Sequence, residues 1–178
     1  VSNPDKFYNQ IPIGGGKESI DIGKEENDKK FVLVELKPWS SSNSPLYAVV
    51  ESLKNLIEYR IIHEKQIKHH QDCKHYNEVD LIVLAPESYY RDYRLIDNRT
   101  GQRREDKIGI VKKALNDLCS EFNTNIAFMV LNISKEDINI QCQSLEPDEN
   151  NIVKLSEINS IPRLARDQWK LLVSSDKK

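Results

Sequence analysis

The sequence lacks the features that would place it in a membrane or in an oxidising compartment. No apolar run approaches the length of a transmembrane helix, and the N-terminus has no secretory signal pattern. The three cysteines (Cys73, Cys119 and Cys142) are odd in number and have no close-paired spacing, so they do not indicate a disulfide framework. We therefore expect a reduced, cytoplasmic protein with no membrane partner.

The chain also lacks an excess of basic charge. With a formal net charge of −2, it has no overall positive field that would attract nucleic acid, so any binding of a polyanion must come from a local patch. At 178 residues it is long enough for one domain with a substantial core. Because it opens with Val1 rather than methionine, we expect either a processed chain or part of a longer protein with an additional domain upstream.

Hydrophobic patterning predicts strands and helices that alternate along the chain. Prolines and glycines indicate an irregular lead-in over residues 1–17. Residues 18–145 are expected to form an α/β core, and residues 146–178 a C-terminal helical extension of the same domain anchored by Trp169. The predicted strands are 18–22, 31–37, 79–85, 125–132 and an edge strand at 138–142, and the predicted helices run from 45 to the high sixties and over 108–122. This order predicts a central mixed β-sheet flanked by helices.

The strand at 31–37 ends in a carboxylate and an ammonium. Residues 31–34 are apolar at odd and even positions alike, which is typical of a central strand covered on both faces. Side chains alternate along a strand, so Glu35 and Lys37 share one face and Leu36 takes the other. Charges at the rim of a buried strand cost desolvation free energy unless they have partners. A divalent cation bound beside Glu35 would be such a partner. The alternative is that Glu35 and Lys37 only mark where the strand leaves the core.

Asp21 lies on the preceding strand, and in a hairpin its side chain comes to rest beside Glu35. Asp21, the tripeptide Glu35-Leu36-Lys37 and the helix after the next short loop resemble the PD-(D/E)XK nuclease superfamily, which has the restriction-endonuclease-like fold. The resemblance covers residues 18–132. It implies Mg²⁺ or Mn²⁺ held by Asp21, Glu35 and the Leu36 carbonyl, and phosphodiester hydrolysis in DNA. Lys37 would orient the attacking water or stabilise negative charge on phosphorus.

Two further family features bear on this resemblance. Many members carry a glutamate or glutamine together with a tyrosine on the helix after the lysine, and Glu51 and Tyr59 are the accessory candidates here. Many also have an acidic helix before the first strand, whereas the residues ahead of Glu18 do not look helical. The alternative function is a non-catalytic module that keeps the same fold and binds nucleic acid or protein.

A second feature is the segment from Tyr89 to Arg104, in which tyrosines and arginines interleave. Rings stack on bases and guanidinium groups pair with phosphates, so this pattern predicts a nucleic-acid-binding loop. Its candidate residues are Tyr90, Arg91, Tyr93, Arg94, Arg103 and Arg104. In the alternative interpretation this is an ordinary solvated loop, and its arginines are neutralised by Asp92, Asp97, Glu105 and Asp106.

The histidines of the chain are clustered. His63, His69, His70 and His75 all lie near Cys73. Imidazole and thiolate are the usual ligands of zinc, so one hypothesis is a zinc-stabilised interaction domain. The spacing matches no standard zinc finger, and a polar helix end that runs into an exposed loop explains the cluster more simply.

Overall fold

The computed structural model describes residues 6–13, 18–27, 29–38, 41–64, 76, 78–132 and 169–176, without the side chains of 6–13, 18–19 and 62–64. The predicted strand at 138–142 and the predicted zinc ligands lie outside these residues or these side chains.

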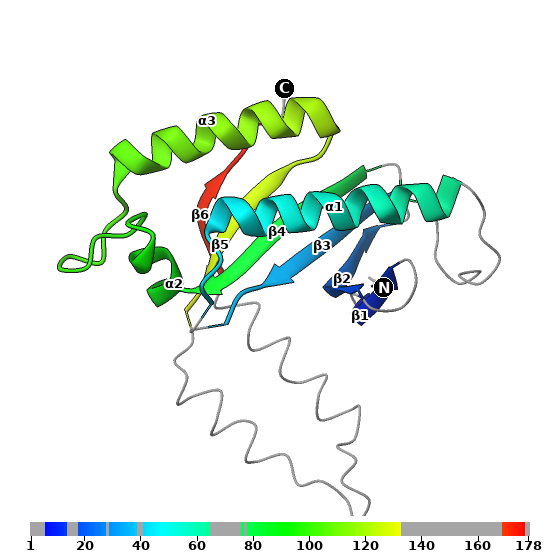
Figure 1. Ribbon diagram of the computed structural model, residues 1–178, viewed down its shortest axis with the longest axis horizontal. Coiled ribbons are helices and arrows are strands. Elements are labelled where there is room, and N and C mark those ends of the chain that lie inside the picture. The colour runs from blue at the N-terminus through cyan, green and yellow to red at the C-terminus, as the bar shows by residue number, and fades with distance from the viewer. Residues whose placement is uncertain are drawn as a thin grey trace, which may run out of the picture.

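The described strands form one six-stranded mixed sheet (Figure 1). Their order in space is their order in the sequence: β1 (Lys6–Ile13), β2 (Glu18–Asn27), β3 (Lys30–Leu36), β4 (Glu78–Pro86), β5 (Ile126–Leu131) and β6 (Trp169–Ser174). β1, β2 and β3 are antiparallel neighbours, β3, β4 and β5 run parallel, and β6 returns antiparallel to β5. The predicted α/β class and mixed sheet are therefore confirmed. The strands predicted at 18–22 and 31–37 pair as a hairpin, and they correspond to β2 and β3.

In the described part of the chain, three helices connect these strands: α1 (Pro45–Glu64), α2 (Glu87–Asp92) and α3 (Glu105–Phe122). α1 and α3 lie over the same face of the sheet, where Leu56 and Leu115 share one core with Leu81 and Phe128 (Figure 1). On the opposite face, Val32, Val34 and Leu84 are buried in a second, smaller cluster. β3 is thus buried on both faces, which explains why it is apolar at consecutive positions.

α1 begins where the sequence predicts it. Ser44 Oγ accepts a hydrogen bond from the Tyr47 N–H at 3.2 Å, and Pro45 occupies the first helical position, where no N–H is needed. The apolar residues of α1 fall on two sides of the helix. Val49, Leu53 and Leu56 are buried against the sheet, whereas Leu46, Val50, Ile57 and Ile61 are exposed. No helix in the described part of the chain is long and apolar enough to cross a membrane.

Three predictions of local structure are wrong. Residues 6–13 of the lead-in form β1, and its Pro12 is tolerated because β1 is at the edge of the described sheet. Residues 169–174 form β6 instead of a helix, because they pair with the free edge of β5. Residues 87–92 form α2 instead of a loop. β1 forms by pairing with the neighbouring β2, and β6 by pairing with β5, which lies far upstream in the sequence. A local hydrophobic pattern does not show such pairing.

Candidate functional site

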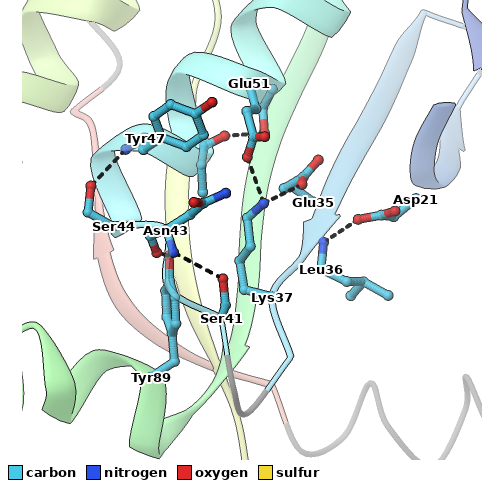
Figure 2. Close-up of polar contacts among 12 residues, drawn as sticks. Asp21, Glu35, Leu36, Lys37, Ser41, Asn43, Ser44, Tyr47, Glu51 and Tyr89 are labelled. Carbon is cyan, nitrogen blue, oxygen red and sulfur yellow. Dashed lines mark hydrogen bonds and ion pairs between the residues drawn. The ribbon is translucent and has the colours of Figure 1, made fainter. Parts of the chain in front are cut away.

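The candidate site lies at the end of β3, on the sheet face that α1 covers (Figure 2). The Lys37 N–H donates to the Leu84 carbonyl at 3.0 Å, which continues the pairing with β4 beyond the last residue of the strand. The Lys37 side chain turns towards α1. Its Nζ lies 2.7 Å from Glu35 Oε1 and 2.7 Å from Glu51 Oε2, so one ammonium joins two carboxylates from different elements.

Burial makes this ion pair expensive to disrupt. The side chains of Lys37 and Glu35 are only 8% and 12% exposed, whereas that of Glu51 is 35% exposed. Burial raises the pKa of Glu35, the hydrogen bond from Lys37 opposes this rise, and the charges of Asp21 and Glu51 add to it. Burial also lowers the pKa of Lys37, but hydrogen bonds to Glu35 and Glu51 outweigh this effect and leave its pKa raised. Lys37 is therefore a cation at neutral pH.

Asp21 approaches the site from β2. The pairing of β2 with β3 ends at Ile22 and Val34, one position before Asp21 and Glu35 would face each other. There the Asp21 carboxylate replaces the backbone partner, since its Oδ2 accepts a hydrogen bond from the Leu36 N–H at 2.8 Å (Figure 2). Its charge is close enough to raise the pKa of Glu35. The structure thus brings together Asp21, Glu35 and Lys37, as the hairpin prediction requires.

The two accessory candidates have different locations. Glu51 belongs to the site, because α1 carries it over the end of β3. Tyr59 does not. Its ring is buried and stacks on Phe31 with the ring centroids 6.0 Å apart, at the beginning of β3. Tyr59 is therefore a core residue in this structure, and its prediction as an accessory site residue is corrected.

α2 holds the loop that leads from the site into α1. The Tyr89 hydroxyl donates to the Asn43 carbonyl at 2.7 Å, and the Tyr93 hydroxyl donates to the Ser42 carbonyl at 2.6 Å. The two rings meet edge to face with centroids 5.3 Å apart. Burial raises the pKa of Tyr89, and the charges of Tyr93, Glu51 and Glu35 raise it further, so this phenol stays protonated. Sequence reasoning missed Tyr89, although its spacing of four from Tyr93 indicates a shared helix face.

Two predicted nucleic-acid-binding residues have structural roles instead. Tyr90 is fully buried, and its hydroxyl donates to the carbonyls of Val83 at 2.8 Å and Met129 at 3.2 Å. Its ring has no face free for a base, so the prediction that it stacks is wrong. The guanidinium of Arg91 is engaged by Glu87 and by the Asn98 carbonyl. It braces the chain between α2 and α3 and is not a free phosphate ligand.

The donor set of the site suits a hard cation. Asp21 and Glu35 offer carboxylate oxygens, which Mg²⁺ and Mn²⁺ prefer, and Mg²⁺ is commonly bound by one or two carboxylates while it keeps several waters. Asp21 Oδ1 and Glu35 Oε2 have no hydrogen-bond partner among the described residues. Within the same residues, no group of three or more His, Cys, Asp and Glu side chains is arranged to hold a metal. Among the described side chains, the carboxylates of Asp21 and Glu35 are therefore the ones that could bind a cation at this site.

Comparison with known proteins adds no constraint on this site. No protein-family model, curated protein or solved structure matches the chain.

Proposed function

We propose that this protein is a Mg²⁺- or Mn²⁺-dependent nuclease that hydrolyses phosphodiester bonds in DNA, with a site of the PD-(D/E)XK type. The observation that carries the proposal is the position of Lys37. Its ammonium is buried, charged and held between Glu35 and Glu51 at the end of a strand, with Asp21 beside it. The order of hairpin, helix and parallel strand around these residues is the order that the resemblance implies, which further supports a restriction-endonuclease-like fold.

Each side chain has a definite role in this proposal. Asp21 and Glu35 would hold the metal, which when bound polarises the phosphoryl oxygen and lowers the pKa of the attacking water. Lys37 donates hydrogen bonds to the attacking water or to the phosphoryl oxygen on which negative charge develops. Glu51 keeps the flexible Lys37 side chain on the α1 side of the site. Tyr89 and Tyr93 position Glu51 by fixing the start of α1.

The test is a titration of Mn²⁺ into the wild type and Glu35→Ala by calorimetry, followed by incubation of both proteins with plasmid DNA. We expect the wild type to bind the metal and nick the plasmid, and Glu35→Ala to lose both activities while it remains folded by circular dichroism. Glu58→Ala is the matched control, because this glutamate also lies on the α1 side of the sheet but pairs with the exposed Lys54. Equal cleavage by Glu35→Ala and the wild type would refute the proposal.

A second candidate function is a non-catalytic module that binds nucleic acid or protein. The observation in its favour is that Lys37 already supplies a positive charge to Glu35, so the folded chain does not need a metal there. This function predicts DNA binding that a chelator leaves unchanged, with no cleavage product in Mg²⁺ or Mn²⁺.

A further inference from the structure

The segment from Tyr93 to Lys107, which follows α2, carries a local excess of positive charge. It contains five arginines and lysines and three acidic residues, in a chain whose net charge is −2. It leaves α2 at the end of the sheet where β3 and β4 finish, and projects beyond α2 before it enters α3 (Figure 1). We call residues 93–107 the basic arm.

The basic arm has a defined conformation. Leu95 and Ile96 are buried in the core and anchor its base. The Arg104 N–H donates to the Leu95 carbonyl, the Asp97 N–H donates to the Gln102 carbonyl, and Ile96 and Arg103 form an antiparallel bridge. These contacts join the outgoing and returning halves of the arm.

The tip of the arm is closed by Asp97 and Arg91. Asp97 Oδ1 accepts hydrogen bonds from the backbone N–H groups of Arg99 at 2.9 Å and Thr100 at 2.8 Å. Arg91 Nη1 donates to the Asn98 carbonyl at 3.2 Å. Gly101 has a φ of 68°, which glycine adopts without strain, and a Cβ there would lie 3.3 Å from Arg91 Nη2. The Asp97 carboxylate therefore stabilises the turn through hydrogen bonds to its backbone.

The cations of the arm differ in their availability. Arg103 and Arg104 each lie 3.3 Å from an acid at the start of α3, Glu105 and Asp106. Both pairs are exposed, so they contribute little and can exchange for a phosphate. Arg94 and Arg99 are exposed, and in the part of the chain that the structure describes their guanidinium groups have no partner.

The backbone of Arg94 supports a functional role. Its φ is 58°, a left-handed conformation that costs free energy for any residue with a Cβ. The hydrogen bonds from the N–H groups of Arg94 and Leu95 to the carbonyls of Arg91 and Tyr90 maintain this turn. Glycine or asparagine would fit this turn with less strain, so the backbone conformation does not account for an arginine at this position.

The rings of this region are not available for stacking. Tyr89 and Tyr90 are buried, and Tyr93 is half-buried with its hydroxyl on the Ser42 carbonyl. Single strands without base preference are bound largely by base stacking on aromatic rings, whereas duplexes are gripped largely through their phosphates. The arm offers free guanidinium groups without free rings.

We infer that the basic arm binds the backbone phosphates of a double-stranded nucleic acid through Arg94 and Arg99, and so delivers a duplex to the site at the end of β3. This inference rests on the proposed function for the role of that site, but the binding itself does not require cleavage.

The experiment measures binding of a short labelled DNA duplex by fluorescence anisotropy, in EDTA and over a series of salt concentrations. Arg94→Gln/Arg99→Gln is compared with Lys29→Gln/Lys113→Gln, which removes the same charge from exposed lysines before β3 and on α3. We expect the arginine variant to bind about tenfold more weakly, and the slope of log K against log salt to lose about two units, one for each phosphate contact. The lysine variant should lose less than half of that slope.

Each outcome bears on a different claim. Equal loss of duplex binding in the two double variants overturns the inference, and if the wild type still nicks plasmid DNA with Mn²⁺ the proposed nuclease stands. Selective loss in the arginine variant, together with no cleavage by the wild type, supports the inference and refutes the nuclease. Tighter binding of a single strand of the same length overturns the assignment to a duplex.

Discussion

Lys37 Nζ and Glu51 Oε2 lie 2.7 Å apart, although β3 and α1 are separated by a loop and the two residues by fourteen positions. The same Nζ lies 2.7 Å from Glu35. This single ammonium therefore connects the strand that ends in the candidate site to the helix above it.

Removal of the ammonium should destabilise the fold more than removal of Glu51. Lys37→Met leaves Glu35 buried without a cation, so we expect a loss of about 2 to 4 kcal/mol in the free energy of unfolding. Glu51→Gln leaves Lys37 paired with Glu35 and removes a more exposed carboxylate, so about 1 kcal/mol is expected. Urea denaturation measures both values. Lys54→Met, at an exposed pair, is the control, and an equal cost for Lys37→Met would contradict this account.

Glu35 should make stability fall as the pH rises through the acidic range. Its pKa in the folded state is raised above the ordinary value of 4.5, so the folded protein binds this proton more tightly than the unfolded chain. The resulting stabilisation is fully present below 4.5 and is lost as the pH rises through the raised pKa. Relative to Glu35→Gln, the unfolding free energy of the wild type should therefore decrease over that window and become constant above it. A difference that does not vary with pH would show that Glu35 has no raised pKa.

Tyr89→Phe should destabilise the protein, because it leaves the Asn43 carbonyl without its donor. We expect a cost of about 1 to 2 kcal/mol in the free energy of unfolding. Tyr47→Phe is a matched control, because this residue of α1 is 51% exposed and the same change there should cost less than about 0.5 kcal/mol. Because the loop also positions Glu51 in the proposed function, Tyr89→Phe should reduce the rate of DNA cleavage at saturating substrate. Tyr47→Phe should leave the contact of Glu51 with Lys37 intact, and with it the rate of cleavage.

Arg94→Gly should separate stability from binding. Glycine relieves the left-handed strain at a φ of 58°, so we expect an unchanged free energy of unfolding or a gain of up to about 1 kcal/mol. Duplex binding should weaken at the same time, because one phosphate contact is lost. Thermal unfolding and anisotropy test the two effects. A variant that is less stable would show that the Arg94 side chain supports the fold, and not a ligand.

Much of the fold could be predicted because its signals are local. Consecutive apolar residues in β3 indicate a strand buried on both faces, and Ser44 followed by Pro45 indicates the start of α1. The hairpin of β2 and β3 brings Asp21 towards Glu35, since antiparallel pairing places positions at matching distances from the turn opposite each other.

What the sequence by itself determined is the identity of the core strands and helices and the shared face of Glu35 and Lys37. The tertiary structure alone decided that residues 6–13 and 169–174 are edge strands, that Tyr90 is buried and Arg94 exposed, and that Glu51 reaches Lys37 whereas Tyr59 stacks on Phe31. The physical reason is that periodicity reports which residues share a face of one element. Which other element covers that face depends on pairing and packing across the whole chain. A tyrosine or an arginine of the same local pattern can therefore lie in the core or on the surface.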